Sequence, residues 1–337
     1  MTEHTALAQL QSTSPSAPAK ALEVNSLSIV SQREGAVTEI VSDVSYSIAS
    51  GRTLGVVGES GCGKTMTSLA VMGLLPANLS GSGSIRIAGQ EMEGASERIW
   101  ENVRGNRVAM VFQEPMSALN PVMQIGTQIA EVIVRHRGTS KRAAHEEAIE
   151  LLAAVGIPSP RERANDYPHH LSGGMRQRAM IAIALACQPA LLVADEPTTA
   201  LDVTIQAQIL DLMVELQDRT GTAIQFISHN LAVVSQVAHE IMVMYAGRVV
   251  ERASSQVMFS APLHPYTRGL IETLPDPDHP VKRLAVIPGA VQSMAAGTTG
   301  CRFAKRCHLA DDQCAQVSPA LELQGPSHWV ACHKAGT

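Results

Sequence analysis

The chain has 337 residues, of which 45% are hydrophobic and 17% are charged. This length and composition allow a buried core in two domains, or in one large and one small domain, and exclude a chain that is disordered throughout. The net charge of −5 and the few aromatic residues (2 Trp, 4 Tyr and 4 Phe) argue against a nucleic-acid partner, which needs a basic surface or stacking platforms.

The first twenty residues are rich in Ser, Thr, Pro and Ala, which favours a disordered tail over residues 1–20. They lack the basic and apolar regions of a secretion signal. The most apolar region, Ala179–Ala194, is interrupted by Gln188 and Pro189, and it falls short of the roughly 18 apolar residues that a bilayer span needs. We therefore expect that any role at a membrane depends on a partner chain.

The pattern after the tail predicts an α/β core. Thr53–Val57 is a continuous apolar run before a glycine-rich loop, which is typical of a buried parallel strand that leads into a helix. The range 115–168 has a helical pattern, and in 143–155 the charges fall mostly on one solvated face. Alternating buried strands and helices indicate a parallel sheet. Further β-structure is predicted at 22–30, 39–48, 84–88, 191–194 and 223–228, with a hairpin at 242–250.

A phosphate-binding loop follows the first buried strand. GESGCGKT, at Gly58–Thr65, matches GxxxxGK[ST], in which backbone N–H groups and a helix N-terminus provide donors for phosphate. Lys64 is expected to reach the β- and γ-phosphates, and the hydroxyl of Thr65 to ligate Mg²⁺. The predicted nucleotide contacts here are Gly58, Glu59, Ser60, Gly61, Cys62, Gly63, Lys64, Thr65 and Met66.

Two acidic residues end the apolar run LLVADEP at 191–197. Asp195 is expected to hold Mg²⁺, and Glu196 to orient or deprotonate the attacking water. Two further polar residues stand where switches are expected. Gln113 is a candidate to sense Mg²⁺ and the water, and His229 is a candidate to hydrogen-bond the γ-phosphate. The predicted catalytic residues are therefore Glu196, His229, Lys64 and Gln113, with Thr65, Gln113 and Asp195 at the magnesium ion.

LSGGMRQR, at Leu171–Arg178, lies between the phosphate loop and the acidic pair. With these motifs, residues 22–252 resemble the ATP-binding cassette (ABC) ATPases. The resemblance implies a phosphate-loop NTPase core with a parallel sheet, an antiparallel β subdomain and a helical subdomain at about 115–175. It also implies that Ser172, Gly173 and Gly174 contact ATP held by an opposite subunit, and that Ala200-Leu201-Asp202 crosses the interface. A helix N-terminus at 172–174 provides the physical reason.

The chain departs from that pattern at Ser31. Family members usually place an aromatic residue near the end of the first strand, where adenine stacks, and no aromatic residue lies between Leu22 and Asp43. Stacking contributes roughly 1–3 kcal/mol per base. We expect weaker nucleotide affinity, or an adenine contact from elsewhere.

The last part of the chain carries a second resemblance. His264-Pro265-Tyr266-Thr267, IPG at 287–289, GCRFAKRC at 300–307 and VACH at 330–333 resemble the tail of oligopeptide, dipeptide and nickel importer ATPases, dipeptide-permease type. We expect an ABC ATPase domain at 21–255 and a small, loop-rich C-terminal cysteine domain at 256–337.

Four cysteines, Cys301, Cys307, Cys314 and Cys332, have the spacing C-x5-C-x6-C-x17-C. Four thiolates suit zinc or an iron–sulfur cluster, but zinc sites usually include close C-x2–4-C pairs. Dipeptide-type relatives carry a 4Fe–4S cluster at matching cysteines, so the resemblance implies such a cluster here. Zinc and reduced, metal-free thiols remain alternatives.

The resemblance implies an ATP-hydrolysing subunit of a peptide importer at the cytoplasmic face of the cell membrane, using ATP and Mg²⁺. Its expected partners are a second ATPase subunit, of a different chain since relatives form unlike pairs, two transmembrane permease subunits and an extracytoplasmic binding protein. Nickel or another small solute is an alternative cargo.

Two other classes of protein are also considered. One is a soluble ABC ATPase that acts on nucleic acid or ribosomes, but such proteins commonly carry two cassettes or a coiled-coil insertion. The other is an iron–sulfur protein with a vestigial cassette, against which the intact Lys64, Asp195, Glu196 and His229 argue.

Overall fold

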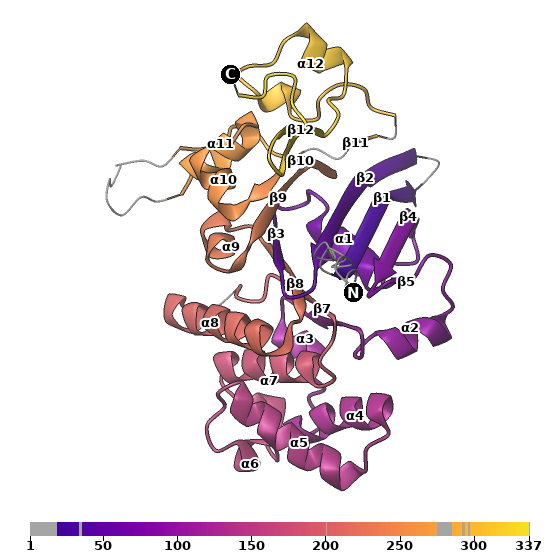
Figure 1. The fold of residues 1–337 in the computed structure, drawn as a ribbon, viewed down its shortest axis with the longest axis vertical. Helices are drawn as coiled ribbons and strands as arrows, with labels where there is room; N and C mark the ends of the chain where they lie inside the picture. The colour runs from indigo at the N-terminus through magenta and orange to yellow at the C-terminus, as the bar shows by residue number, and fades with distance from the viewer. Residues whose placement is uncertain are drawn as a thin grey trace, which may run out of the picture.

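The computed structural model describes residues 19–33, 36–199, 201–274, 285–291, 294–295 and 297–336. Residues 1–18 of the predicted tail lie outside these ranges. Figure 1 shows a central sheet, a group of helices at one end of the molecule and the C-terminal region at the other. In the described ranges no helix is long and apolar enough to cross a membrane.

The central sheet has eight strands in the order β12-β13-β10-β9-β3-β8-β7-β6. Strands β9, β3, β8, β7 and β6 are parallel, and the remaining pairs are antiparallel. The apolar runs in β3, β7 and β8 are buried at every position, because helices or the second sheet cover both faces. The strands are β3 (Thr53–Val57), β6 (Val108–Val111), β7 (Leu191–Asp195), β8 (Ala223–Ser228), β9 (Glu240–Tyr245), β10 (Arg248–Ser254), β12 (Glu322–Gly325) and β13 (His328–Val330).

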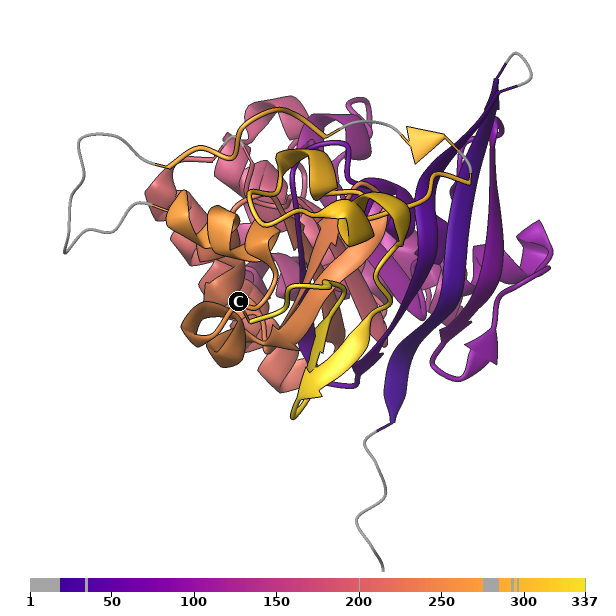
Figure 2. The same ribbon diagram turned by 90° about the horizontal axis from the view of Figure 1, so that it is seen from above.

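A second, antiparallel sheet has the order β11-β2-β1-β4-β5. Figure 2 shows it beside the central sheet. Side chains from the two sheets, among them Leu22, Ile87 and Val56, form one hydrophobic core together with Val71. The strands are β1 (Lys20–Arg33), β2 (Ala36–Ala49), β4 (Leu79–Ile87), β5 (Gln90–Glu91) and β11 (Met294–Ala295), and Val71 ends helix α1 (Lys64–Val71).

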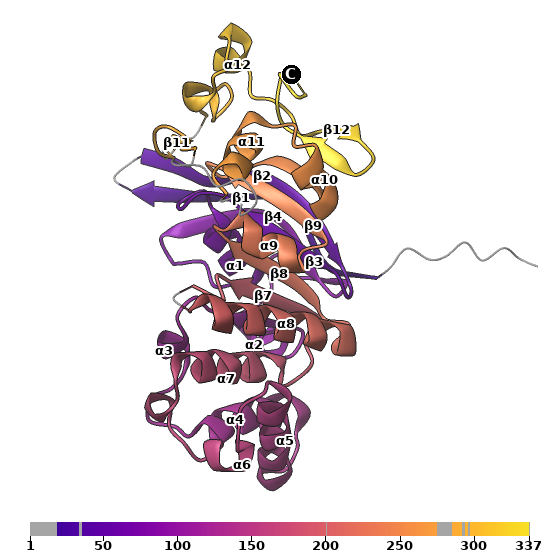
Figure 3. The same cartoon turned by 90° about the vertical axis from the view of Figure 1, so that its left-hand side faces the viewer.

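Helices cover the other face of the central sheet and extend beyond it (Figure 3). Val57 and Phe226 of the sheet share a second hydrophobic core with residues of α4, α5, α7, α8 and α9. The remaining helices are α2 (Glu97–Val103), α3 (Pro115–Ala118), α4 (Ile125–Arg137), α5 (Lys141–Ala154), α6 (Pro160–Arg163), η1 (Pro168–His170), α7 (Gly173–Leu185), α8 (Val203–Thr220), α9 (Leu231–Val237), α10 (Ser255–Ser260), α11 (Pro265–Glu272), η2 (Ala304–Arg306) and α12 (Asp312–Gln316).

These elements confirm the predicted α/β class with its parallel sheet, antiparallel subdomain and helices. The predicted hairpin turns at Ala246 and Gly247, whose φ angles of 45° and 84° suit a tight turn between twisted strands. A difference lies in the C-terminal region. Strand β13 pairs with β10, and β11 pairs with β2, so this region extends both sheets instead of forming a separate unit of loops. Strands β12 and β13 therefore join a sheet whose other strands precede the proposed boundary at 255/256, which itself lies in helix α10.

Candidate functional site

The phosphate loop joins the carboxyl end of β3 to the start of α1, in the middle of the parallel sheet. Gly63 caps α1 with a φ angle of 103°, which a residue with a side chain rarely adopts. A Cβ atom at Gly58 would lie 2.2 Å from the carbonyl oxygen of Met244. Glycine at these two positions therefore lets the loop turn sharply against the neighbouring strand.

Lys64 is the first residue of α1 and is 5% exposed. Its Nζ donates to the carbonyl oxygens of Gly58, at 2.6 Å, and Glu59, at 3.0 Å, and lies 3.8 Å from Sγ of Cys62. A buried ammonium requires a compensating charge. Its hydrogen bonds reach only neutral groups of the loop, so the site suits an anionic ligand such as the triphosphate of ATP.

Asp195 ends β7 and faces the phosphate loop. The hydroxyl Oγ1 of Thr65 lies 3.5 Å from Oδ1 of Asp195. Burial raises the pKa of Asp195, against the lowering effects of the Thr65 hydroxyl and the Lys64 charge. A carboxylate and a hydroxyl are oxygen ligands of the kind that Mg²⁺ prefers. These two residues therefore fit the predicted magnesium site.

Glu196 follows directly and stands at the centre of a polar cluster. Its Oε2 accepts from Nε2 of Gln113, at 3.3 Å, and from Oγ1 of Thr199, at 2.9 Å. Its Oε1 lies 3.2 Å from Nδ1 of His229. The Glu196 backbone has a φ angle of 48°, a strained value for a residue with a side chain and one often found at functional sites. The structure thus brings three of the four predicted catalytic residues into direct contact, and Thr199 is a fourth member that the sequence reasoning missed.

Serine 172 caps helix α7, and its Oγ accepts from the backbone N–H of Met175 at 3.4 Å. Gly173 and Gly174 form the first turn. Asp202 caps α8 in the same way, accepting from Ile205 N–H at 2.9 Å. None of the hydrogen bonds that Ser172 or Asp202 makes among the described residues reaches the phosphate loop. Ala200 of the predicted interface segment lies outside the described ranges.

The remaining predicted loop contacts differ in exposure. Ser60, Gly61 and Thr65 are exposed at the mouth of the loop, whereas Cys62 is fully buried. Met66 is half-buried and packs against the core between the sheets. Glu59 is half-buried, and its carboxylate is paired with Arg306 of the C-terminal region at 3.1 Å.

The predicted 4Fe–4S cluster is wrong, and so is zinc as its alternative. In the described ranges, which include all four C-terminal cysteines, no group of three or more His, Cys, Asp or Glu side chains is arranged to hold a metal. All four are free cysteines. Burial raises the pKa of Cys301 to about 11 and also raises the pKa values of Cys307 and Cys332.

A phosphate loop at the end of a parallel strand, with a neighbouring acidic pair, defines a nucleotide-hydrolysing α/β protein. The family model described as ABC transporter matches residues 41–199, and the model of the oligopeptide/dipeptide transporter C-terminal region matches 250–314. Among solved structures, the chain resembles the dimeric ATP-binding cassette MJ0796 with a TM-score of 0.62 and 24% identity, over 69% of this chain and 98% of that one, which supports the fold.

Curated relatives match along almost the whole chain. A probable peptide ABC transporter ATP-binding protein of Sinorhizobium fredii is 48% identical over 93% of this chain and 95% of its own length. The dipeptide transport protein DppD of Escherichia coli is 46% identical, over 93% and 96%, and the oligopeptide transport protein AppD of Bacillus subtilis is 46% identical, over 92% and 95%. The chain belongs to the ABC transporter family as an ATP-binding protein, and its enzymatic activity is that of an ATPase.

Proposed function

We propose that the chain is the ATP-hydrolysing subunit of an importer that takes up dipeptides or oligopeptides. The observation that carries this proposal is the convergence of Lys64, Asp195 and Glu196 on one edge of the sheet, in a chain that matches peptide-transporter relatives over almost its full length. The C-terminal match favours peptides over nickel or another solute. The same matches favour a transporter subunit over a soluble cassette ATPase.

The residues of the site have complementary roles in this proposal. Lys64 and the loop N–H groups bind the β- and γ-phosphates, and the Mg²⁺ held near Thr65 and Asp195 supplies charge neutralisation for the phosphates. Glu196 accepts a proton from the attacking water. His229 and Gln113 hold the Glu196 carboxylate in place and complete the contacts to the γ-phosphate and the water.

In this proposal, the remaining contacts to ATP come from a second ATPase subunit. Ser172 and the first turn of α7 present N–H groups at a helix N-terminus, and Asp202 lies near them because Gly174 packs against Ile205. Two ATPase subunits would enclose ATP head to tail, so that closure moves two transmembrane permease subunits. A binding protein outside the membrane would deliver the peptide, and the chain would lie on the cytoplasmic face of the membrane.

The dimer is tested at Gly173. A Cβ atom at this position meets nothing within 4 Å, and an acidic residue in the first turn stabilises a helix, so Gly173→Asp should fold normally. The added negative charge would face the γ-phosphate held by the partner. We expect ATP hydrolysis by the assembled transporter to fall on the order of a hundredfold, while the isolated chain keeps its ATP affinity.

Ser140→Asp is the matched control, because Ser140 is an exposed cap at the start of α5. Full ATPase activity of the Gly173→Asp transporter would refute the shared site.

The cargo is tested by ATP-dependent uptake of a labelled dipeptide into vesicles that contain the complete transporter. Uptake of nickel without uptake of peptide, or copurification of the chain with nucleic acid instead of permease subunits, would overturn the proposal.

A further inference from the structure

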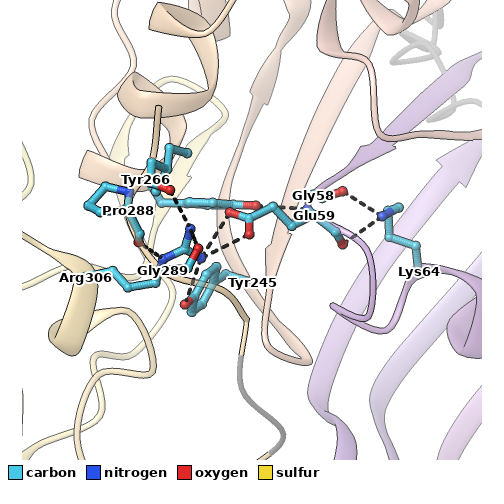
Figure 4. A network of polar contacts seen from close by, with 9 residues as sticks. Gly58, Glu59, Lys64, Tyr245, Tyr266, Pro288, Gly289 and Arg306 are labelled. Atoms are coloured by element: carbon cyan, nitrogen blue, oxygen red, sulfur yellow. Dashed lines mark hydrogen bonds and ion pairs between the residues drawn. The ribbon is translucent and has the colours of Figure 1, made fainter. Parts of the chain in front are cut away.

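The phosphate loop is bound from outside the cassette, by the C-terminal region. The backbone N–H of Glu59 donates to Oη of Tyr266, in α11, at 2.9 Å. Both carboxylate oxygens of Glu59 accept from Nη1 of Arg306, each at 3.1 Å. The carbonyl oxygen of Glu59 accepts from Lys64. Figure 4 shows this chain of contacts, in which one loop residue connects the catalytic lysine to two residues of the C-terminal region.

The guanidinium group of Arg306 is held rigidly. Its Nε donates to the carbonyl oxygen of Pro288 at 2.7 Å, and its Nη2 donates to the carbonyl oxygens of Ile287 and Gly289, each at 3.3 Å. Nη1 also donates to Oη of Tyr245 at 3.3 Å. The side chain is only 8% exposed. Because a buried guanidinium needs its partners and every nitrogen of this one is engaged, Arg306 offers Glu59 a fixed position.

The aromatic surroundings limit movement further. Tyr245, Tyr266 and Phe303 pack against one another with ring centroids 4.8–5.3 Å apart. The Arg306 guanidinium lies over the Tyr245 and Phe303 rings, 5.6 and 5.9 Å from their centroids. Tyr266 is fully buried, and burial raises the pKa of its hydroxyl far above the physiological range. The hydroxyl that binds Glu59 is therefore neutral and immobile.

A second connection runs through Arg302, four residues before Arg306. Its Nη1 donates to the carbonyl oxygen of Ala246, and its Nη2 pairs with Glu39. The next residue in that turn, Gly247, donates its N–H to the carbonyl oxygen of Cys62 at 2.9 Å. Two arginines of one short segment thus support both ends of the phosphate loop, one directly at Glu59 and one through the β9–β10 turn at Cys62.

We infer that the C-terminal region sets the nucleotide affinity of the phosphate loop through Glu59, with Arg306 and Tyr266 as positioning residues. The inference rests on the proposed function, since it concerns the same ATP site. Phosphate binding needs loop N–H groups that already point inward, and holding the loop in that form lowers the cost of binding. Arg306 also neutralises the Glu59 carboxylate, which would otherwise place a negative charge on the loop that receives a triphosphate.

The two contributions of Arg306 are separated by substitution in the full chain, with MgATP as the probe. Arg306→Met removes the charge and the hydrogen bonds, and we expect the dissociation constant for MgATP to rise on the order of tenfold. Adding Glu59→Gln removes the unpaired carboxylate, so the double variant should bind MgATP more tightly than Arg306→Met alone. Arg306→Lys keeps a positive charge and should fall between wild type and Arg306→Met.

Arg252→Met is the matched control. Arg252 is also largely buried, and its Nη2 pairs with Glu240 at 2.7 Å and donates to the carbonyl oxygen of Ser47 at 3.2 Å. Glu240 lies beside Leu54 at the start of β3, whereas the phosphate loop follows the other end of that strand. Loss of this arginine should lower stability and leave MgATP affinity unchanged.

The outcomes separate this inference from the proposed function. If Lys64→Ala weakens MgATP binding while Arg306→Met binds as tightly as wild type, the ATP site stands and the inference is wrong. The inference is also wrong if Arg252→Met weakens binding as much as Arg306→Met, or if Glu59→Gln gives no recovery, because either result marks a general loss of stability. Tenfold weaker binding by Arg306→Met, with recovery in the double variant, supports it.

Discussion

The carboxylate of Glu196 lies 3.2 Å from Nδ1 of His229, although the two residues follow different strands of the central sheet. The parallel pairing of β7 with β8 produces this contact, because it places the carboxyl ends of both strands at the same edge. Gln113, which follows β6, joins the same carboxylate from the other side. Three neighbouring strands are therefore each followed by one polar side chain of the proposed catalytic cluster.

Replacing the proposed base should separate binding from hydrolysis. In Glu196→Gln the side chain keeps its shape but cannot accept a proton from water, so the hydrolysis rate of the assembled transporter should fall by about 10²–10⁴. ATP affinity should remain, and the variant should accumulate a closed, ATP-bound dimer. Size-exclusion chromatography with ATP measures the dimer, and phosphate release measures the rate.

The control for that experiment is Glu215→Gln, on α8, where the Glu215 side chain forms an exposed ion pair with Arg219 and, among the described residues, no other polar contact. It should hydrolyse ATP at the wild-type rate. A Glu196→Gln transporter that turns over ATP as fast as Glu215→Gln would show that another group accepts the proton.

Lys64→Ala should impair ATP binding, the step before hydrolysis, as well as hydrolysis itself. The substitution removes the charged side chain that, among the described residues, donates to the loop carbonyls of Gly58 and Glu59, and with it the cation proposed to face the phosphates. We expect hydrolysis to fall on the order of 10²–10³, with weakened MgATP binding measured by titration calorimetry. Wild-type ATPase activity in this variant would contradict the assignment of the site.

Local patterns were sufficient to predict the phosphate loop and the acidic pair. Both motifs are short, and each follows a run of buried apolar residues that identifies a strand end. The four-residue strand β6, VAMV, was missed because so short a run does not distinguish a strand from a buried helical turn. The pairing of Glu59 with Arg306 was beyond sequence reasoning, since 247 residues separate the two and no local period connects them.

For the cysteines, by contrast, the sequence led to a prediction that is wrong. Their positions in the sequence showed that four thiols lie near the end of the chain, and the resemblance then implied that they bind a 4Fe–4S cluster. Spacing does not determine where sulfur atoms point. In the structure, Cys314 is buried and its carbonyl oxygen accepts from the Cys301 N–H at 2.7 Å, while Sγ of Cys332 accepts from the Lys334 N–H at 3.3 Å.

The thiol of Cys301 should therefore react slowly. Burial raises its pKa to about 11, and the thiolate is the nucleophile, so at pH 8 only roughly a thousandth of this group is reactive. Alkylation by iodoacetamide should be on the order of a hundredfold slower than in an unstructured cysteine peptide. Mass spectrometry of the labelled peptides measures it, with the chain unfolded in urea as the reference. Equal rates in the folded and unfolded chain would refute the prediction.

An aromatic residue at position 31 should strengthen nucleotide binding. Ser31 lies in β1, with Thr38 and Leu79 opposite it on the two neighbouring strands. In Ser31→Tyr a ring could stack on adenine and contribute roughly 1–3 kcal/mol, which corresponds to about 5- to 150-fold in affinity. Gln32→Tyr is the control, because the next residue along a strand points to the opposite face. If Ser31→Tyr binds MgATP no more tightly than Gln32→Tyr, adenine is not held at this strand.

The stability of the chain should depend on pH through His264. This residue is 1% exposed, its Nδ1 accepts from the Tyr266 N–H, and burial lowers its pKa to about 4. An unfolded histidine titrates near 6.5. Between these two values the unfolded chain takes up a proton that the folded chain excludes, so stability is highest above pH 6.5 and falls as the pH drops toward 4.

The loss attributable to this group should reach roughly 3 kcal/mol at pH 4. Urea unfolding at pH 7.5, 6, 5 and 4.5 measures it. His264→Asn keeps a side-chain acceptor for the cap of α11 but does not titrate, so its free energy of unfolding should fall less steeply below pH 6.5 than that of the wild type. Parallel curves for the two proteins would refute the prediction, because they would show that His264 takes up its proton as readily in the folded chain as in the unfolded one.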